Sequence, residues 1–305
     1  MKQLEAFAPG IYPRSEALVQ ATRDLDRGRT TQEAVDQQVE RDLAELVSAQ
    51  QAAGLDLLAD GMLRWQDHFR PLLEAAEGLE TGALTRFLDT NTFYRAPHGT
   101  TATPKLPAPL GERDIAPLPA PRLVTLPSPF ALSQGTGVPA LTIAEDVLKP
   151  ALDGVDADLV VLAEPFFGRA EDAAPSDLEE PLAALSGGPR LALQLTFCDA
   201  RKPLEQGLGE LPVDAIGIDF YGTHLADVPK GFDKLLLAGV IDARSSTLED
   251  SRELASFAER LHNEREVEQV ALVPNGDLQF VSERIAREKL LRLGAAKTAT
   301  VKAAV

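Results

Sequence analysis

Polar side chains follow eight short apolar runs of the sequence, and these positions are where chemistry is expected. In α/β barrels the active face is built from residues just past the carboxyl ends of the parallel strands. Such positions hold carboxylates, arginines and histidines, together with a few other polar residues, namely Tyr12, Arg14, Asp60, Arg64, Asp67, His68, Ser128, Glu164, Thr196, Cys198, Asp219, Tyr221, His224, Asp242, Arg244, Asn275 and Asp277. A polar ring of this kind suits a small polar or zwitterionic ligand.

Two carboxylates of this ring are the candidate catalytic groups. Glu164 ends the run VVLAEP, and Asp219 lies near the end of GIDFYG. Carboxylates held in position act as general acids or bases in many active sites. Glu164 also has a structural interpretation, in which it caps a helix that follows it. Arg14 of the ring has one as well, in which it closes the barrel mouth by pairing with a carboxylate.

A metal site has few possible ligands in this sequence. Zinc requires three or four Cys, His or carboxylate ligands that converge on one point. Cys198, Asp219 and His224 follow neighbouring runs and form the one candidate set. The chain has no His-x-Cys pair, no second cysteine and no HExxH motif. We therefore expect no zinc or other cofactor, and we interpret Cys198 as an inert buried thiol.

The apolar runs alternate with helical stretches. They cover residues 7–11, 56–60, 123–126, 158–163, 191–197, 215–220, 234–238 and 267–273. Unbroken runs such as DLVVLA and KLLLAG are typical of parallel strands buried on both faces. Eight repeats of the alternation predict a single closed (β/α)8 barrel over residues 1–305. A doubly wound open sheet is the alternative, but no glycine-rich phosphate loop supports it.

One segment departs from this alternation. Residues 96–121 are rich in proline and glycine and lie between the second helix and the third strand. This composition predicts a long loop. We interpret the segment as an excursion from the barrel and not as a domain boundary.

The composition excludes several classes of partner. The chain has 305 residues, a formal net charge of −17 and a single cysteine. A polyanion repels nucleic acid and anionic lipid, and one cysteine excludes an internal disulfide framework. No run fits a signal peptide or the roughly 20 apolar residues of a membrane span. These features predict a cytoplasmic protein that binds small molecules and neither nucleic acid nor membranes.

Motifs at the ends of the runs resemble a known family. GIYPRSEALVQA, AGLDLLADGMLRWQDH, LPSPFALSQG, VVLAEPFF, LQLTFCDA, PVDAIGIDFYG, LLLAGVIDARSS and VALVPNGDLQFV are similar, in order, to strand ends of cobalamin-independent methionine synthase. The most specific match is RFLDTNTFYRAP, which resembles the Asp-Thr-Asn-aromatic segment of that enzyme's amino-terminal barrel and adds Asp89 and Asn91 to the candidate residues. The similarity extends over nearly the whole chain.

The resemblance implies a barrel of the methionine synthase/uroporphyrinogen decarboxylase-like type and a methyl-transfer reaction. The family, 5-methyltetrahydropteroyltriglutamate–homocysteine methyltransferase, moves a methyl group from a methylated folate to homocysteine, whose thiol a zinc ion holds as thiolate. The positions that match its zinc ligands hold Gln194, Thr196, Asp219 and Gly276, so only the carboxylate is retained. Two further acidic positions of the family are Ala163 and Met62 here.

These departures imply the amino-terminal, non-zinc barrel of the family as a chain of its own. Its expected role is methionine biosynthesis beside a separate zinc-bearing barrel, with methylfolate or another methyl donor and homocysteine as ligands. The substrate-binding residues that we expect are Tyr12, Arg14, Asp60, Arg64, Asp67, His68, Asp89, Asn91, Ser128, Thr196, Tyr221, Asp242, Arg244 and Asn275. For a polyglutamate tail, positive charge would have to come from Arg14, Arg64, Arg95 or Arg244.

Two other functions stay open at the level of sequence. One is a self-sufficient methyltransferase with an unorthodox site around Glu164, Cys198, Asp219 and His224. The other is a non-catalytic small-molecule-binding barrel, or a barrel recruited to a different reaction, because this fold hosts many chemistries.

Overall fold

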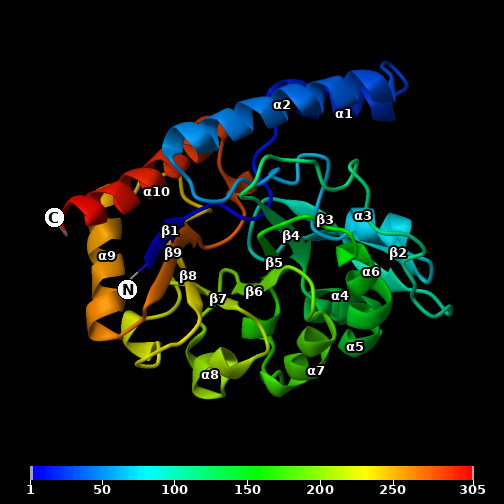
Figure 1. Cartoon of the computed structure of the whole chain (residues 1–305). Helices are drawn as coiled ribbons and strands as arrows, with labels where there is room; N and C mark the ends of the chain where they lie inside the picture. Colours follow the sequence, from blue (N-terminus) through cyan, green and yellow to red (C-terminus); the bar gives the residue numbers. More distant parts are fainter. Residues whose placement is uncertain (1–2, 304–305) are drawn as a thin grey trace.

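A curled sheet of seven parallel strands forms the centre of the computed structural model, which describes residues 3–303 (Figure 1). In pairing order the strands are β1 (Gln3–Ala6), β9 (Gln269–Pro274), β8 (Leu235–Ile241), β7 (Ala215–Asp219), β6 (Arg190–Leu195), β5 (Leu159–Glu164) and β4 (Leu123–Pro127). From β4 to β9 each strand pairs with its neighbour in the sequence, without the reversal of order that defines a doubly wound sheet. The prediction of a parallel, barrel-like α/β fold is therefore confirmed, and the open doubly wound alternative is wrong. The prediction of a closed (β/α)8 barrel is not confirmed, because within residues 3–303 β1 and β4 are the two edges of the sheet and do not pair with each other.

The prediction of an eighth strand at residues 56–60 is wrong. Within the described residues this segment contributes a single parallel bridge, between Leu58 and Arg122. Leu58 N–H donates to the Pro121 carbonyl at 3.0 Å, and Leu123 N–H donates to the Leu58 carbonyl at 2.9 Å. The sheet is thus a seven-stranded half-barrel with one further bridge beside β4.

Side chains take the place of ladder partners in this segment, which explains why no strand forms. Ala59 donates its N–H to Gln50 Oε1 at 2.9 Å, and Gln50 Nε2 donates to the Ala59 carbonyl at 2.8 Å. On the β1 side, the Asp56 carboxylate accepts the Ala6 N–H at 2.8 Å, and Asp56 N–H donates to the Ala6 carbonyl at 2.9 Å. Backbone groups bonded to side chains cannot also extend a ladder.

The first predicted strand is displaced along the chain. Residues 7–11 lie just past β1, where the backbone turns at Gly10 with a φ of 86°. Gly10 N–H donates to Thr125 Oγ1, and Ile11 N–H donates to Asp277 Oδ1, each at 2.9 Å. The apolar run FAPGI therefore forms the loop after β1, because side chains of other strand ends bind its amides. The remaining predicted strands agree with β4 to β9 within a few residues.

Helices surround the sheet (Figure 1). The long ones are α1 (Glu16–Asp26), α2 (Gln32–Ala53), α9 (Ser251–Glu264) and α10 (Glu283–Ala303). Shorter ones are α3 (Arg70–Ala75), α4 (Pro129–Thr136), α5 (Ala140–Ile143), α6 (Lys149–Leu152), α7 (Ser176–Ala184) and α8 (Arg201–Glu205), with one π turn at Ala144–Leu148. The sheet interior holds a layer of buried apolar side chains, among them Val161, Leu237 and Val273. No helix among residues 3–303 is long and apolar enough to span a membrane.

An antiparallel hairpin lies outside the sheet and was not predicted. It consists of β2 (Leu79–Arg86) and β3 (Phe93–Gly99), joined by residues 87–92. The motif RFLDTNTFYRAP forms its tip and its second strand, and α3 and α4 pack beside it. The segment 96–121 therefore begins inside β3 and continues as an irregular loop to β4, so the predicted excursion is confirmed only in its later part.

We predict that Gly294→Ala destabilises the protein. A Cβ at this position of α10 would lie 1.6 Å from the Ala53 carbonyl oxygen at the end of α2, so the two helices would have to separate. Overpacking of this kind costs about 1–3 kcal/mol, whereas helix propensity alone would favour alanine by about 1 kcal/mol. Urea unfolding measures the difference. Gly188→Ala is the control, because its Cβ meets nothing within 4 Å; equal stability of the two variants would contradict this packing.

Candidate functional site

Glu164, the last residue of β5, holds the loops around it. Its Oε1 accepts the backbone N–H groups of Phe166 and Phe167, each at 2.7 Å, and its Oε2 accepts the hydroxyl of Ser128. Ser128 in turn caps α4, since its Oγ accepts the Ala131 N–H at 3.0 Å. Burial raises the pKa of Glu164, and these hydrogen bonds oppose the rise. The carboxyl group is fully buried and joins the ends of β4 and β5.

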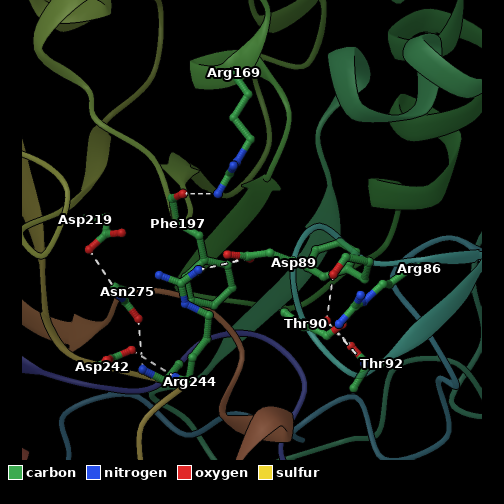
Figure 2. A network of polar contacts seen from close by, with 12 residues as sticks. Arg86, Asp89, Thr90, Thr92, Arg169, Phe197, Asp219, Asp242, Arg244 and Asn275 are labelled. Atoms are coloured by element: carbon green, nitrogen blue, oxygen red, sulfur yellow. Dashed lines mark hydrogen bonds and ion pairs between the residues drawn. The ribbon is translucent and has the colours of Figure 1, made fainter.

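Asp219, at the end of β7, uses one carboxylate oxygen in the same way. Its Oδ1 accepts the Tyr221 N–H at 2.8 Å and Asn275 Nδ2 at 3.0 Å. Asn275 Oδ1 accepts the Ala243 N–H at 2.9 Å, so the ends of β7, β8 and β9 are linked (Figure 2). Burial raises the pKa of Asp219, against the hydrogen bonds from Asn275 and Tyr221. Oδ2 of Asp219 has no hydrogen-bond partner among residues 3–303.

Arg244 connects the β8 loop to the tip of the hairpin. Its guanidinium carbon lies 4.5 Å from the centre of the Phe197 ring, which is a cation–π contact. Its Nη1 lies 3.2 Å from Asp89 Oδ1 in the hairpin tip (Figure 2). The neighbouring tip residue Asn91 accepts a hydrogen bond from Arg86 at 3.1 Å. Asp89 and Asn91 of the RFLDTNTFYRAP motif therefore hold the hairpin tip, Asp89 through Arg244 of the β8 loop and Asn91 through Arg86.

An aromatic cluster lies between the hairpin and the strand ends. Its members come from the hairpin, from the start of α3 and from loops after β5, β6 and β9, and they are Phe69, Phe87, Tyr94, Phe166, Phe197 and Phe280. Phe87 stacks on Phe280 with ring centres 6.0 Å apart, and Phe197 meets Phe280 edge-on at 5.5 Å. Sequence reasoning missed this cluster, because no spacing rule connects rings on such distant loops.

Three more carboxylates of the predicted ring bind loop amides. Asp67 Oδ1 accepts the N–H groups of Phe69 and Arg70, each at 2.8 Å, and its Oδ2 accepts the Arg95 N–H at 3.0 Å. Asp60 accepts the N–H groups of Met62 and Ala116 at 2.9 and 3.1 Å. Asp242 accepts the Arg244 N–H at 3.0 Å. These groups position loops by direct contact with the backbone.

His68 and Asp277 form a buried pair. Nε2 of His68 lies 2.6 Å from Oδ2 of Asp277, whose other oxygen accepts the Ile11 N–H. Burial by itself lowers the pKa of His68, but the charge and hydrogen bond of Asp277 and the charge of Asp67 outweigh it, so the pKa is raised. Nδ1 of His68 is the one buried side-chain polar atom of residues 3–303 without a hydrogen-bond partner. The sequence placed Asp277 in the polar ring of strand-end residues but not among the expected substrate-binding residues.

Other predicted residues lie apart from these groups. Arg64 pairs with Asp36 of α2, and Tyr221 is about half exposed, with its hydroxyl donating to Glu249 at 3.1 Å. Thr196 is buried and donates its N–H to the Glu164 carbonyl at 3.1 Å. Tyr12 and Arg14 line a separate cleft beside β1.

The donor set does not fit zinc. Burial raises the pKa of Cys198 to about 12, so this thiol is protonated at neutral pH. His224 is exposed and begins the short turn after β7. Gln194, at one of the positions that correspond to zinc ligands of the family, donates to the Pro274 carbonyl at 2.9 Å. Residues 3–303 contain no group of three His, Cys, Asp or Glu side chains that would hold a metal ion.

Solved structures with this fold include methionine synthases. A B12-independent methionine synthase from Shewanella sp. W3-18-1, in complex with selenomethionine, has a TM-score of 0.73 and 16% identity over 99% of this chain and 98% of that chain. A Listeria monocytogenes protein described as a putative vitamin-B12-independent methionine synthase has a TM-score of 0.70 and 15% identity, over 97% of this chain and 98% of that chain. A methyltransferase from Methanosarcina mazei has a TM-score of 0.54 and 12% identity, over 98% of this chain and 94% of that chain.

At these identities the likeness is one of fold, and it confirms at that level the resemblance read from the motifs. No family model and no curated protein matches the sequence.

We predict that Glu164→Ala destabilises the protein more than Glu164→Gln. Alanine leaves the amides of Phe166 and Phe167 buried and unpaired, at about 1–3 kcal/mol each. Glutamine keeps one oxygen for these amides and can donate its amide to Ser128, so we expect a loss of about 1 kcal/mol. Urea unfolding of the two variants measures both losses.

The pH dependence gives a second readout of the same pair. The pKa of Glu164 is higher in the folded protein than in the unfolded chain, where a glutamate has a pKa of about 4.3. The free energy of unfolding therefore falls as the pH rises from that value through the pKa of the folded state. Glu164→Gln should remove that loss. Equal stability of the alanine and glutamine variants at every pH would show that the carboxyl group does not hold the loop.

Proposed function

We propose that the chain is a methyl-transfer barrel of methionine biosynthesis that binds an amino-acid substrate and works beside a separate zinc-bearing barrel. The observation that carries the proposal is a whole-length likeness to B12-independent methionine synthases combined with a donor set that does not fit zinc. A zinc ion held by the partner would activate the homocysteine thiol. The residues of this chain would bind and orient the substrate and exclude water.

We place the amino-acid substrate at the strand ends near Asp219. The Asp219 side chain is largely buried, and its Oδ2 is available to accept an ammonium group. Arg244 pairs with Asp89 through Nη1 and has further guanidinium donors for a carboxylate. The Shewanella protein binds selenomethionine, an amino acid of the same class. We therefore propose homocysteine or methionine as the ligand and Asp219 and Arg244 as its binding residues, with a methylated folate as the methyl donor.

A self-contained methyltransferase is the second candidate. It is favoured by the near-complete coverage of the Shewanella and Listeria chains, which leaves no room for a second barrel in those chains. This candidate requires turnover by the purified chain alone. The protonated state of Cys198 speaks against that thiol as its nucleophile, so Cys198→Ala should retain any activity that the chain has.

We predict that homocysteine or methionine raises the melting temperature of the purified chain and that Asp219→Asn abolishes this shift. A ligand at 100 times its Kd stabilises the folded state by about 2.7 kcal/mol. Asp153→Asn is the matched control, because Asp153 is exposed and precedes β5 at the opposite end of the strands.

An activity assay then separates the two candidates. Methyl transfer from methyltetrahydrofolate to homocysteine is measured with the chain alone and with a zinc-bearing methionine synthase barrel added. A rate of the mixture that exceeds the sum of the rates of the two separate proteins supports the arrangement with a zinc-bearing partner. Turnover by the chain alone supports the self-contained methyltransferase. Absence of both binding and turnover would contradict the methyl-transfer proposal.

A further inference from the structure

A cleft of about 620 Å³ lies beside the strand-end groups. Its walls are the loop after β1, one face of α1, residues 65–66 and the segment that leads from β9 into α10. Three arginines from different segments line it, and they are Arg14, Arg23 and Arg284. Asp219 and Arg244 do not line it, so it is separate from the proposed amino-acid site.

The three arginines make no close ion pair within the described residues, although the charge of Asp42 acts on Arg14. None of them takes part in an ion pair within 4.0 Å or in a side-chain hydrogen bond with residues 3–299. Burial, followed by the charge of Arg23, lowers the pKa of Arg14, and the charge of Asp42 opposes the shift. Glu16 and Glu283 also line the cleft, and neither forms an ion pair within 4.0 Å with these three arginines. In a chain of net charge −17, three guanidinium groups against the two carboxylates of Glu16 and Glu283 leave the cleft lining with an excess of positive charge that an anion would neutralise.

The inner end of the cleft leads toward His68. Gln66 and Gln279 line both the cleft and a small cavity of about 10 Å³, which His68 also lines and which has room for about one water. Gln279 Nε2 donates to Asp277 Oδ2 at 3.2 Å, beside the bond that this oxygen makes with His68. His68 Nδ1 has no partner within the described residues. An imidazolium held by Asp277 presents Nδ1–H as a buried donor that lacks an acceptor.

We propose that this cleft binds a small anion through the guanidinium groups of Arg14, Arg23 and Arg284, and that an oxygen of the ligand, or a water that it holds, accepts from Nδ1–H of His68. The ligand class is a compact carboxylate or phosphate with at least two negative charges. Guanidinium groups bind the oxygens of both kinds of anion in bidentate geometry. The proposal does not depend on methyl transfer, because none of these groups is assigned to the amino-acid site.

Calorimetric titration with inorganic phosphate and with succinate, at constant ionic strength, tests the proposal and separates the two anion chemistries. Binding of at least one probe at one site per chain is expected, and Arg14→Ala and Arg284→Ala should each weaken it at least tenfold. Arg252→Ala is the matched control, because Arg252 is exposed on α9 and has no ion pair within the described residues. Equal effects of all three variants, or binding of neither probe, would overturn the proposal.

A spectroscopic readout tests the role of His68. The ¹⁵N resonance of His68 Nδ1 should shift when the bound anion is added to the labelled protein, and His68→Gln should weaken binding while leaving the fold intact by circular dichroism. An anion that binds without moving this resonance would remove His68 from the site. Methionine binding should be unchanged in Arg284→Ala, so a failure of this proposal is distinguishable from a failure of the methyl-transfer proposal.

Discussion

Hydrogen bonds from loop amides to buried carboxylates at the strand ends are the interaction on which the rest of this structure depends. Glu164, Asp219, Asp67 and Asp277 each accept at least one backbone N–H from a loop beside the strand ends. A buried carboxylate is costly unless it is hydrogen-bonded, and so is a buried amide. Each pairing satisfies both groups, and it fixes the loops that carry the aromatic cluster and the hairpin.

This arrangement limits what the site can do chemically. Carboxylates that accept loop amides have fewer acceptor sites left for a substrate, so most carboxylates of the polar ring position loops. Groups that these hydrogen bonds leave available include Oδ2 of Asp219, further donors of the Arg244 guanidinium, Nδ1 of His68 and the arginines of the cleft. They are suited to bind charged groups of a ligand, and they lie in two places, which agrees with two separate binding sites better than with one central reaction centre.

The sequence predicts the sheet well where strands are continuous apolar runs, as in β5 and β8. It fails at residues 56–60, because the side chains of Gln50 and Asp56 replace ladder bonds there, and no local pattern signals that replacement. The hairpin was missed because its strands are largely exposed and lack apolar alternation. The strand-end position of Glu164 is readable from VVLAEP, but its hydrogen bonds to loop amides depend on tertiary geometry, and so does the His68–Asp277 pair.

Residue-resolved amide hydrogen exchange tests most directly whether buried carboxylates hold the loops. The amides of Phe166, Phe167, Ile11 and Tyr221 lie outside strands, yet each donates to a carboxylate. The account predicts that they exchange about as slowly as amides inside β5, whereas the amide of the exposed Gly188 exchanges much faster. Fast exchange at Phe166 and Phe167 would contradict the account, because it would mean that Glu164 does not hold the loop that follows it.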